Sequence, residues 1–204
     1  MSPQQTSPNL RIRAARRQDI GPLSSLLADS FHPPEGLIGL VQPLFRFGIR
    51  EDLRYRLQKS ANHYACLVAV YHPQPTLPLT GHGGERSSAP SVSAPKIVGT
   101  LELSVRRQFW WTSDRYIYIS NVAVDHHYRR RGVARRLLQA SEGVGQDWGL
   151  SVLNLHVMAD NTAARQLYHR AGYTMRNDKS SFDNLLQRSS LQGSRRILLS
   201  KTIA

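Results

Sequence analysis

Residues 125–138 read DHHYRRRGVARRLL, and this stretch decides the fold. Five of its fourteen residues are arginines, and the small residues Gly132 and Ala134 stand among them. A basic tail would need no small residues, whereas a backbone that approaches a polyanion does, because a Cβ would block the approach. The free N–H groups and the dipole of a helix N-terminus also attract anions. The stretch therefore predicts a phosphate-binding turn that opens a helix.

A strand is predicted immediately before this turn and a helix immediately after it. Residues 116–124, YIYISNVAV, are rich in the β-branched and aromatic residues that favour strands. Residues 132–148 place apolar side chains on one helical face, namely Val133, Leu137, Leu138, Val144 and Trp148. Similar patterns predict strands over 10–15, 63–72, 96–105, 151–158, 172–177 and 195–203, and helices after Asp19, within 36–60 and over 161–172. We expect an α/β fold, with a central mixed sheet of about six to seven strands flanked by helices.

The length fits a single domain. With 204 residues, 40% of them hydrophobic, the chain can bury a core without a metal or a disulfide. Residues 1–9 are expected to be a disordered leader, and residues 10–204 to form the domain. Within it, residues 73–95 hold five prolines and three glycines and predict a mobile surface insertion. The single cysteine, Cys66, falls in a predicted buried strand and is expected to be a core residue.

The chain carries a formal net charge of +13, and lysine supplies only four of its 27 basic residues, which leaves 23 arginines. Guanidinium groups suit phosphate and carboxylate, so attraction to polyanions is expected. The arginines are scattered and lack a stacking-aromatic motif, so no specific nucleic-acid partner is predicted. The adjacent His126 and His127 lack ligand partners at a suitable spacing, so no metal is predicted.

No run of eighteen apolar residues occurs, so no membrane partner is expected. The N-terminus holds no apolar segment of the kind found in secretory signals. These features predict a cytoplasmic protein, or one of the plastid stroma if the source is a plant or an alga.

Two motifs carry a resemblance to a known family. The pattern Arg129-x-x-Gly132-x-Ala134 resembles R/Q-x-x-G-x-G/A, the acetyl-CoA signature of the GNAT acetyltransferases. Residues 156–173 resemble the second family segment, in which a strand leads through Asn to a short helix with Tyr and then Gly and an aromatic residue. The matching residues are Asn161, Tyr168, Gly172 and Tyr173.

The resemblance covers approximately residues 10–203 and is strongest over 116–173. Residues 47–57, FGIREDLRYRL, and 63–69, HYACLVA, are similar to the cyanobacterial and plastid branch of the family. Members of that branch acetylate protein N-termini, lysines or arylalkylamines.

This resemblance implies the family's fold and acetyl transfer from the co-substrate acetyl-CoA to an amine. It also implies that the backbone of the strand before the signature pairs with the pantetheine, and that the turn cradles the pyrophosphate. The residues implied in acetyl-CoA binding are Val122, Ala123, Val124, Arg129, Arg130, Arg131, Gly132, Val133, Ala134, Arg135, Asn161, Thr162, Ala163 and Tyr168.

Four residues are candidates for the chemistry. Tyr168 lies where the family carries its proton donor to the CoA sulfur. His156 points away from the apolar face of its predicted strand and suits a general base. Tyr118, on the neighbouring predicted strand, is expected to hold the catalytic water, since similar N-terminal acetyltransferases carry a tyrosine near that point. Glu102 is the acidic residue of the central strands, and either serves as the base instead or binds the substrate amine.

Three functions remain open from the sequence. The first is acetylation of protein amines, either N-terminal α-amines or lysines, by direct attack in a ternary complex. The second is acetylation of a small arylalkylamine of the serotonin type, and Trp110 and Trp111 would either line its pocket or anchor a loop. The third is a non-catalytic basic module that binds nucleic acid or the ribosome. The protein is expected to be a monomer or a homodimer.

Overall fold

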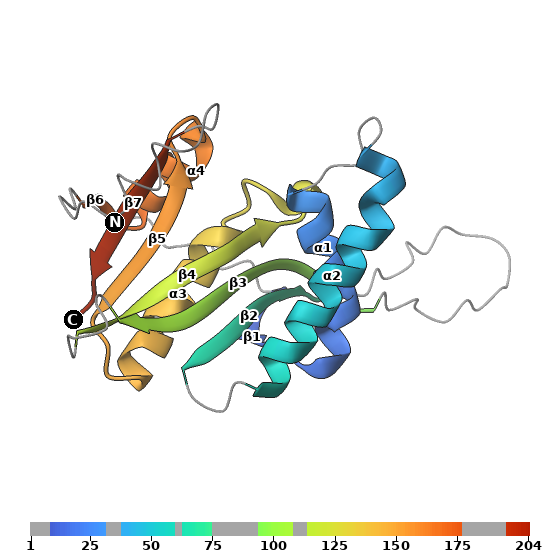
Figure 1. Cartoon of the computed structure of the whole chain (residues 1–204), viewed down its shortest axis with the longest axis horizontal. Coiled ribbons are helices and arrows are strands. Elements are labelled where there is room, and N and C mark those ends of the chain that lie inside the picture. The colour runs from blue at the N-terminus through green and yellow to red at the C-terminus, as the bar shows by residue number, and fades with distance from the viewer. Residues whose placement is uncertain (1–8, 32–37, 60–62, 75–93, 108–113, 177–194) are drawn as a thin grey trace, which may run out of the picture.

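The computed structural model describes residues 9–31, 38–59, 63–74, 94–107, 114–176 and 195–204, and all structural statements concern these residues (Figure 1). The strands are β1 (Leu10–Ala14), β2 (Tyr64–Tyr71), β3 (Lys96–Arg107), β4 (Arg115–Val124), β5 (Val152–Met158), β6 (Thr174–Met175) and β7 (Arg196–Thr202). The helices are α1 (Ile20–Phe31), α2 (Ile38–Lys59), α3 (Val133–Asp147) and α4 (Thr162–Arg170), with short 3₁₀ turns η1 (Arg17–Asp19) and η2 (His126–Tyr128). The predicted leader, most of the predicted insertion and the paired tryptophans lie outside the described residues.

The seven strands form one mixed sheet in the order β1-β2-β3-β4-β5-β7-β6. Neighbours from β1 to β4 are antiparallel, β4 and β5 are parallel, and β5, β7 and β6 are again antiparallel. Helix α3 makes the crossover that a parallel pair requires. The predicted α/β class, with a mixed sheet of six to seven strands flanked by helices, is confirmed.

The helices cover both faces of the sheet (Figure 1), and α4 packs on the same core as α3. On one face, α1 and α2 pack Leu23, Leu27 and Leu53 against the strands. On the other face, α3 inserts Leu137 and Leu138. Alternation along each strand assigns successive side chains to opposite faces, which explains how both cores are filled by the same strands.

Cys66 lies in the core beneath α1 and α2, as the sequence predicts, with 3% of its surface exposed. Burial raises the pKa of its thiol to about 12, although a hydrogen bond with Thr100 opposes the shift. A thiol held in its protonated form is a poor nucleophile.

Strands β4 and β5 separate partway along their length. Their pairing runs only from Ile117 opposite Leu153 to Ile119 opposite Leu155. Both strands continue beyond that point, and Figure 1 shows them diverging toward their carboxyl ends. This divergence opens the sheet at its centre without interrupting the core on either side.

A β-bulge lies where the separation begins. Thr100 of β3 faces Ala123, but Glu102 faces Ser120, so two residues of β4 stand opposite one residue of β3. One of the two, Asn121, has a left-handed backbone conformation with φ of 51°. Bulges of this kind bend a strand and redirect its backbone groups.

Two predicted boundaries differ from the structure. The strand expected over 172–177 is only the two residues of β6, and β3 runs two residues further than expected. The turn expected between β4 and α3 contains the short 3₁₀ turn η2. No helix among the described residues is both long and apolar enough to cross a membrane.

Candidate active site

The turn before α3 forms an open helix N-terminus. Gly132 is the N-cap residue, with φ of 77°, and in the described residues no side chain caps the helix there. The first-turn amides of an α-helix have no partner within the helix. The positive φ favours glycine at this position, and a Cβ built there would meet nothing within 4 Å.

The arginines of this turn have different roles. Arg129 donates from Nε to the carbonyl oxygen of Val124 at 3.2 Å, which ties the turn to the end of β4. The Arg131 guanidinium lies 5.3 Å from the ring centroid of Tyr128. Arg130 adopts a left-handed conformation with φ of 64° and is exposed, as is Arg135. The turn therefore presents positive charge around the free amides.

The remaining residues implied in acetyl-CoA binding divide into buried and exposed ones. Val133 and Ala123 are buried in the two cores, so only their backbone groups are available to a ligand. Val122, Val124 and Ala134 are half-buried.

At α4, Asn161 caps the helix, because its Oδ1 accepts a hydrogen bond from Ala164 N at 3.0 Å. Thr162 and Ala163 follow it and are exposed. The capping role explains an asparagine at this position through local structure alone.

Tyr118 of β4 and His156 of β5 lie together at the start of the divergence. The Tyr118 hydroxyl is 3.1 Å from His156 Nδ1, and which atom donates depends on the tautomer. The Arg106 guanidinium lies 3.7 Å from the centre of the Tyr118 ring, on the same face of the sheet. A hydroxyl and an imidazole at this distance can pass a proton between them.

Tyr168 of α4 is 7% exposed and packs edge to face against Tyr173, with ring centroids 6.0 Å apart. Burial, and then the charge of Tyr118, raise the pKa of Tyr168 to about 12. Its hydroxyl is therefore protonated at neutral pH and is available as a hydrogen-bond or proton donor.

Glu102 of β3 is buried at the bulge and is 1% exposed. Its Oε1 accepts a hydrogen bond from Asn121 Nδ2 at 2.9 Å, and its Oε2 is paired with Arg56 Nη1 at 3.0 Å. Burial, and then the charge of Glu102, raise the pKa of the neighbouring Tyr64 phenol. The side chain thus faces the interior between β3, β4 and α2, with both oxygens already bonded.

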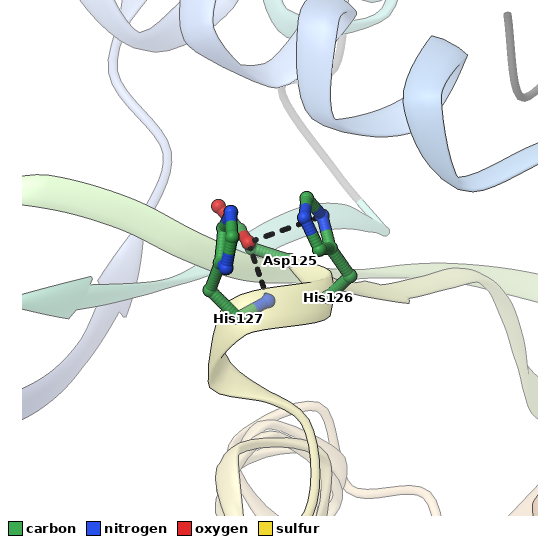
Figure 2. Close-up of side chains that lie close together, drawn as sticks. All are labelled: Asp125, His126 and His127. Atoms are coloured by element: carbon green, nitrogen blue, oxygen red, sulfur yellow. Dashed lines mark hydrogen bonds and ion pairs between the residues drawn. The ribbon is translucent and has the colours of Figure 1, made fainter.

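The two histidines of η2 lie beside Asp125 (Figure 2). The Asp125 carboxylate accepts from His127 N at 2.9 Å and lies 3.7 Å from His126 Nδ1, and possible ligand atoms of all three residues are within 4.8 Å of one another. Partial burial opposes ionisation of Asp125, but the hydrogen bonds from Lys96 and from the His127 backbone outweigh it and lower the pKa.

A cation at this cluster would have to compete with the Lys96 ammonium, which lies 2.8 Å from Asp125 Oδ2. The cluster forms one wall of a cavity of about 1140 Å³ beneath α1, and none of the four predicted catalytic residues lines that cavity. The donor arrangement does not favour a metal, and the prediction of no metal stays a prediction.

The sequence did not single out three residues of this site. Asn121 forms the bulge, Arg56 reaches Glu102 from α2, and Arg106 covers Tyr118. Asparagine adopts the left-handed conformation more often than most residues, so Asn121 gives a weak sequence signal for the bulge. Arg56 acts on a residue 46 positions away, and Arg106 acts through the pairing of β3 with β4, so local patterns could not have identified them.

These features define a class of protein: a mixed sheet with two diverging parallel strands, an open helix N-terminus beside them, and a tyrosine–histidine pair at the point of divergence. The family model described as the acetyltransferase (GNAT) family matches residues 51–173. The chain is 31% identical over 193 residues to the chloroplastic GCN5-related N-acetyltransferase 10 of Arabidopsis thaliana, a match that covers 94% of this chain and 70% of that protein.

Solved structures share the fold at low identity. The PaiA N-acetyltransferase of Thermoplasma acidophilum, in complex with coenzyme A, has a TM-score of 0.61 at 15% identity, covering 95% of this chain and 99% of that one. The NatC complex bound to Gag peptide and CoA has a TM-score of 0.61 at 16% identity, covering 96% and 99%. The chain belongs to the GNAT family and is an acetyl-CoA-dependent N-acetyltransferase.

Proposed function

We propose that this protein transfers the acetyl group of acetyl-CoA to a primary amine of a protein, an N-terminal α-amine or a lysine, by direct attack in a ternary complex. The observation that carries the proposal is the Tyr118–His156 pair, 3.1 Å apart where β4 and β5 diverge. The pair supplies a proton relay beside the path that an acyl thioester would follow from the open N-terminus of α3.

Acetyl-CoA binding in this proposal divides between backbone and side chains. The first-turn amides of α3 hold the pyrophosphate, and the exposed arginines around them add charge-assisted hydrogen bonds. The unpaired edge of β4, from Val122 to Val124, accepts the pantetheine as an added strand. Thr162 and Ala163, at the start of α4, contact the opposite side of the pantetheine.

The reaction then has one bond made and one broken. A water that hydrogen-bonds to the Tyr118–His156 pair passes a proton from the substrate ammonium to His156, and the neutral amine attacks the thioester carbonyl. The new C–N bond forms, the C–S bond breaks, and Tyr168 gives its proton to the departing sulfur. The attacking nitrogen then releases its surplus proton, which restores the Tyr168 phenol. The raised pKa of Tyr168 keeps the phenol protonated at neutral pH, so the proton is present on Tyr168 when the sulfur departs.

Glu102 is a less favourable base in this arrangement. Both of its oxygens have partners, and the side chain is 1% exposed. An incoming amine would have to displace Asn121 or Arg56 before it could deliver a proton.

A protein amine is favoured over a small aromatic amine for two reasons. The NatC neighbour is bound to a peptide, and the strongly basic chain would repel a small cationic amine more than an acidic peptide. The arylalkylamine function remains the second candidate, because the plastid branch that the sequence resembles includes such enzymes. Membership in an enzyme family speaks against the non-catalytic nucleic-acid or ribosome-binding module.

The proposal also covers the localisation and the partners of the protein. The similar Arabidopsis protein is chloroplastic, which supports the plastid stroma if the source is a plant or an alga, and otherwise the cytoplasm. No specific nucleic acid and no membrane is proposed as a partner, and the protein would act as a monomer or a homodimer.

The test measures free CoA release from acetyl-CoA with three acceptor groups: peptides with varied N-termini, N-terminally blocked peptides containing lysine, and serotonin. The proposal expects kcat/KM to be highest for a peptide group, and mass spectrometry then locates the acetyl group. Higher kcat/KM for serotonin would select the second candidate. Absence of release with every acceptor, in a protein that binds CoA by calorimetry, would contradict both.

A further inference from the structure

The buried carboxylate of Glu102 joins three elements at the point where the sheet opens. It lies on β3, accepts a hydrogen bond from Asn121 of β4 at 2.9 Å, and is paired with Arg56 of α2 at 3.0 Å. Arg56 in turn contacts Asp52, one helical turn earlier, at 2.8 Å. Glu102 is 1% exposed, and burying a carboxylate costs free energy. We therefore expect this side chain to stabilise a particular part of the structure.

The part of the structure that Glu102 stabilises is the unusual backbone conformation of the bulge. Asn121 has φ of 51°, a conformation in which residues with a side chain are strained, although asparagine tolerates it better than most. The bond to Glu102 fixes the side-chain amide and thereby opposes relaxation of the backbone. Without it, β4 could return to regular pairing with β3, which would redirect the peptide groups that follow Asn121.

Those peptide groups belong to the part of β4 that has left β5. Pairing between the two strands ends at Ile119, two residues before Asn121, and the register against β3 resumes at Ala123. The peptide groups of Asn121 and Val122 lie in this interval, next to the divergence where the thioester would lie. Backbone N–H groups aimed at a developing oxyanion are among the largest contributors to acyl transfer.

We propose that Glu102 is a positioning residue: through Asn121 it fixes the bulge amides that receive the thioester oxygen, and through Arg56 it ties them to α2. The proposal rests on the acetyl transfer proposed above. It gives Glu102 no part in moving a proton.

The test compares four variants with the wild-type protein. Asn121→Ala removes the side-chain amide and keeps a strained backbone. Asn121→Gly also removes the side-chain amide, but glycine adopts the left-handed conformation freely. Glu102→Gln keeps the shape and can offer an oxygen to only one of its two partners. Arg54→Met is the control, because Arg54 also lies on α2 but pairs with the exposed Glu51. The kcat, the KM for acetyl-CoA, the calorimetric affinity for CoA and the melting temperature are measured for each.

The expected pattern separates kcat from KM. Asn121→Ala and Glu102→Gln should lower kcat about 10- to 100-fold, since small misplacements of a catalytic group have effects of this size. Their KM for acetyl-CoA and their affinity for CoA should change little, because the pyrophosphate turn is intact. Asn121→Gly should recover kcat to within about threefold of the wild-type value, because glycine needs no bond to hold this conformation. Arg54→Met should match the wild type.

A purely structural role for Glu102 would give a different result. Glu102→Gln and Asn121→Ala would then lower the melting temperature while kcat stays within about twofold of wild type, which overturns the positioning role. Equal kcat for Asn121→Gly and Asn121→Ala overturns it too. If Asn121→Ala does not fold, Glu102→Gln against Asn121→Gly decides, and equal values contradict the proposal. A wild-type protein that acetylates no acceptor contradicts the proposed function instead.

Discussion

The Tyr118 hydroxyl and the His156 imidazole lie 3.1 Å apart on neighbouring strands, and they should act as a unit. We expect Tyr118→Phe to lower kcat/KM about 100-fold, a usual effect for loss of a general base or its water. His156→Gln should have a similar effect, and the double variant should lose little more, because groups in one relay are not additive. Steady-state rates over a range of pH check this. Independent, multiplying losses would contradict a shared role.

Tyr168 should act on the leaving group rather than on binding. Tyr168→Phe keeps the packing against Tyr173 and removes only the hydroxyl, so the KM for acetyl-CoA should change little. The kcat should fall about 100-fold, in the range for loss of a general acid. The rate of CoA thiol release checks the expected fall in kcat. An unchanged affinity for CoA, measured by calorimetry, is the control. An unchanged kcat would assign the proton to another donor.

The buried Cys66 thiol makes stability depend on alkaline pH. Its pKa rises from the ordinary 9.0 to about 12 on folding, so the folded state holds its proton more tightly than the unfolded state. The resulting stabilisation is complete below about pH 9 and is lost as the pH rises toward about 12. In Cys66→Ala this part of the alkaline decline should be smaller, measured by urea unfolding at pH 8 and pH 10.5. Thiol-specific labelling of the folded protein at pH 8 should also be slow, and rapid labelling would contradict the burial.

Single residues were predictable where one position determines a local property. The sequence singled out Gly132 as a small residue at a helix start, and the structure places it at the N-cap with a left-handed backbone. Cys66 could be predicted to be buried because its strand is apolar on both sides. The distance between Tyr118 and His156 could be anticipated only from the resemblance, since it depends on the pairing of β4 with β5. Glu102 was predicted to be relevant, but its partners Arg56 and Asn121 lie 46 and 19 residues away, beyond what local patterns show.

At the scale of elements, the turn before α3 allows a test that isolates backbone conformation. Gly132 and Gly143 both have open space around an added Cβ, but only Gly132 has a positive φ. Gly132→Ala should therefore destabilise the protein by about 1 kcal/mol or more and weaken CoA binding, because the first-turn amides shift. Gly143→Ala, inside α3, should stabilise the protein by about 0.5–1 kcal/mol and leave CoA binding unchanged. Thermal unfolding and calorimetry measure both quantities, and equal CoA affinity for the two variants would contradict a role for this turn.

The elements themselves followed from periodicity more closely than their connections did. Apolar spacing predicts α3 to within a residue at each end, because one face must pack on the sheet. It gives no indication of the bulge in β4, since a bulge leaves the composition of a strand unchanged. The divergence of β4 from β5 is likewise a property of pairing, and neither strand encodes it alone.

At the scale of the whole molecule, the net charge of +13 should act mainly on the approach of acetyl-CoA. The co-substrate is a polyanion, and the exposed arginines of the phosphate turn lie at one end of its proposed path. Raising the ionic strength from about 50 to about 500 mM shortens the screening length severalfold, so kcat/KM for acetyl-CoA should fall severalfold. S-acetylpantetheine has the same reacting group without phosphates, and its kcat/KM should change little over the same range.

The comparison separates attraction of the co-substrate from general effects of salt on the enzyme. A similar loss for both donors would show that salt acts on the acceptor or on the fold, not on the diphosphate. Substituting Arg130 and Arg135 by glutamine should reduce the salt dependence for acetyl-CoA, because both are exposed beside the free amides. Glutamine at Arg54 of α2, which pairs with the exposed Glu51 and lies outside the proposed binding residues, should reduce it less. If all three substitutions have equal effects, the attraction comes from the overall charge, and the arginines of the turn have no special part in it.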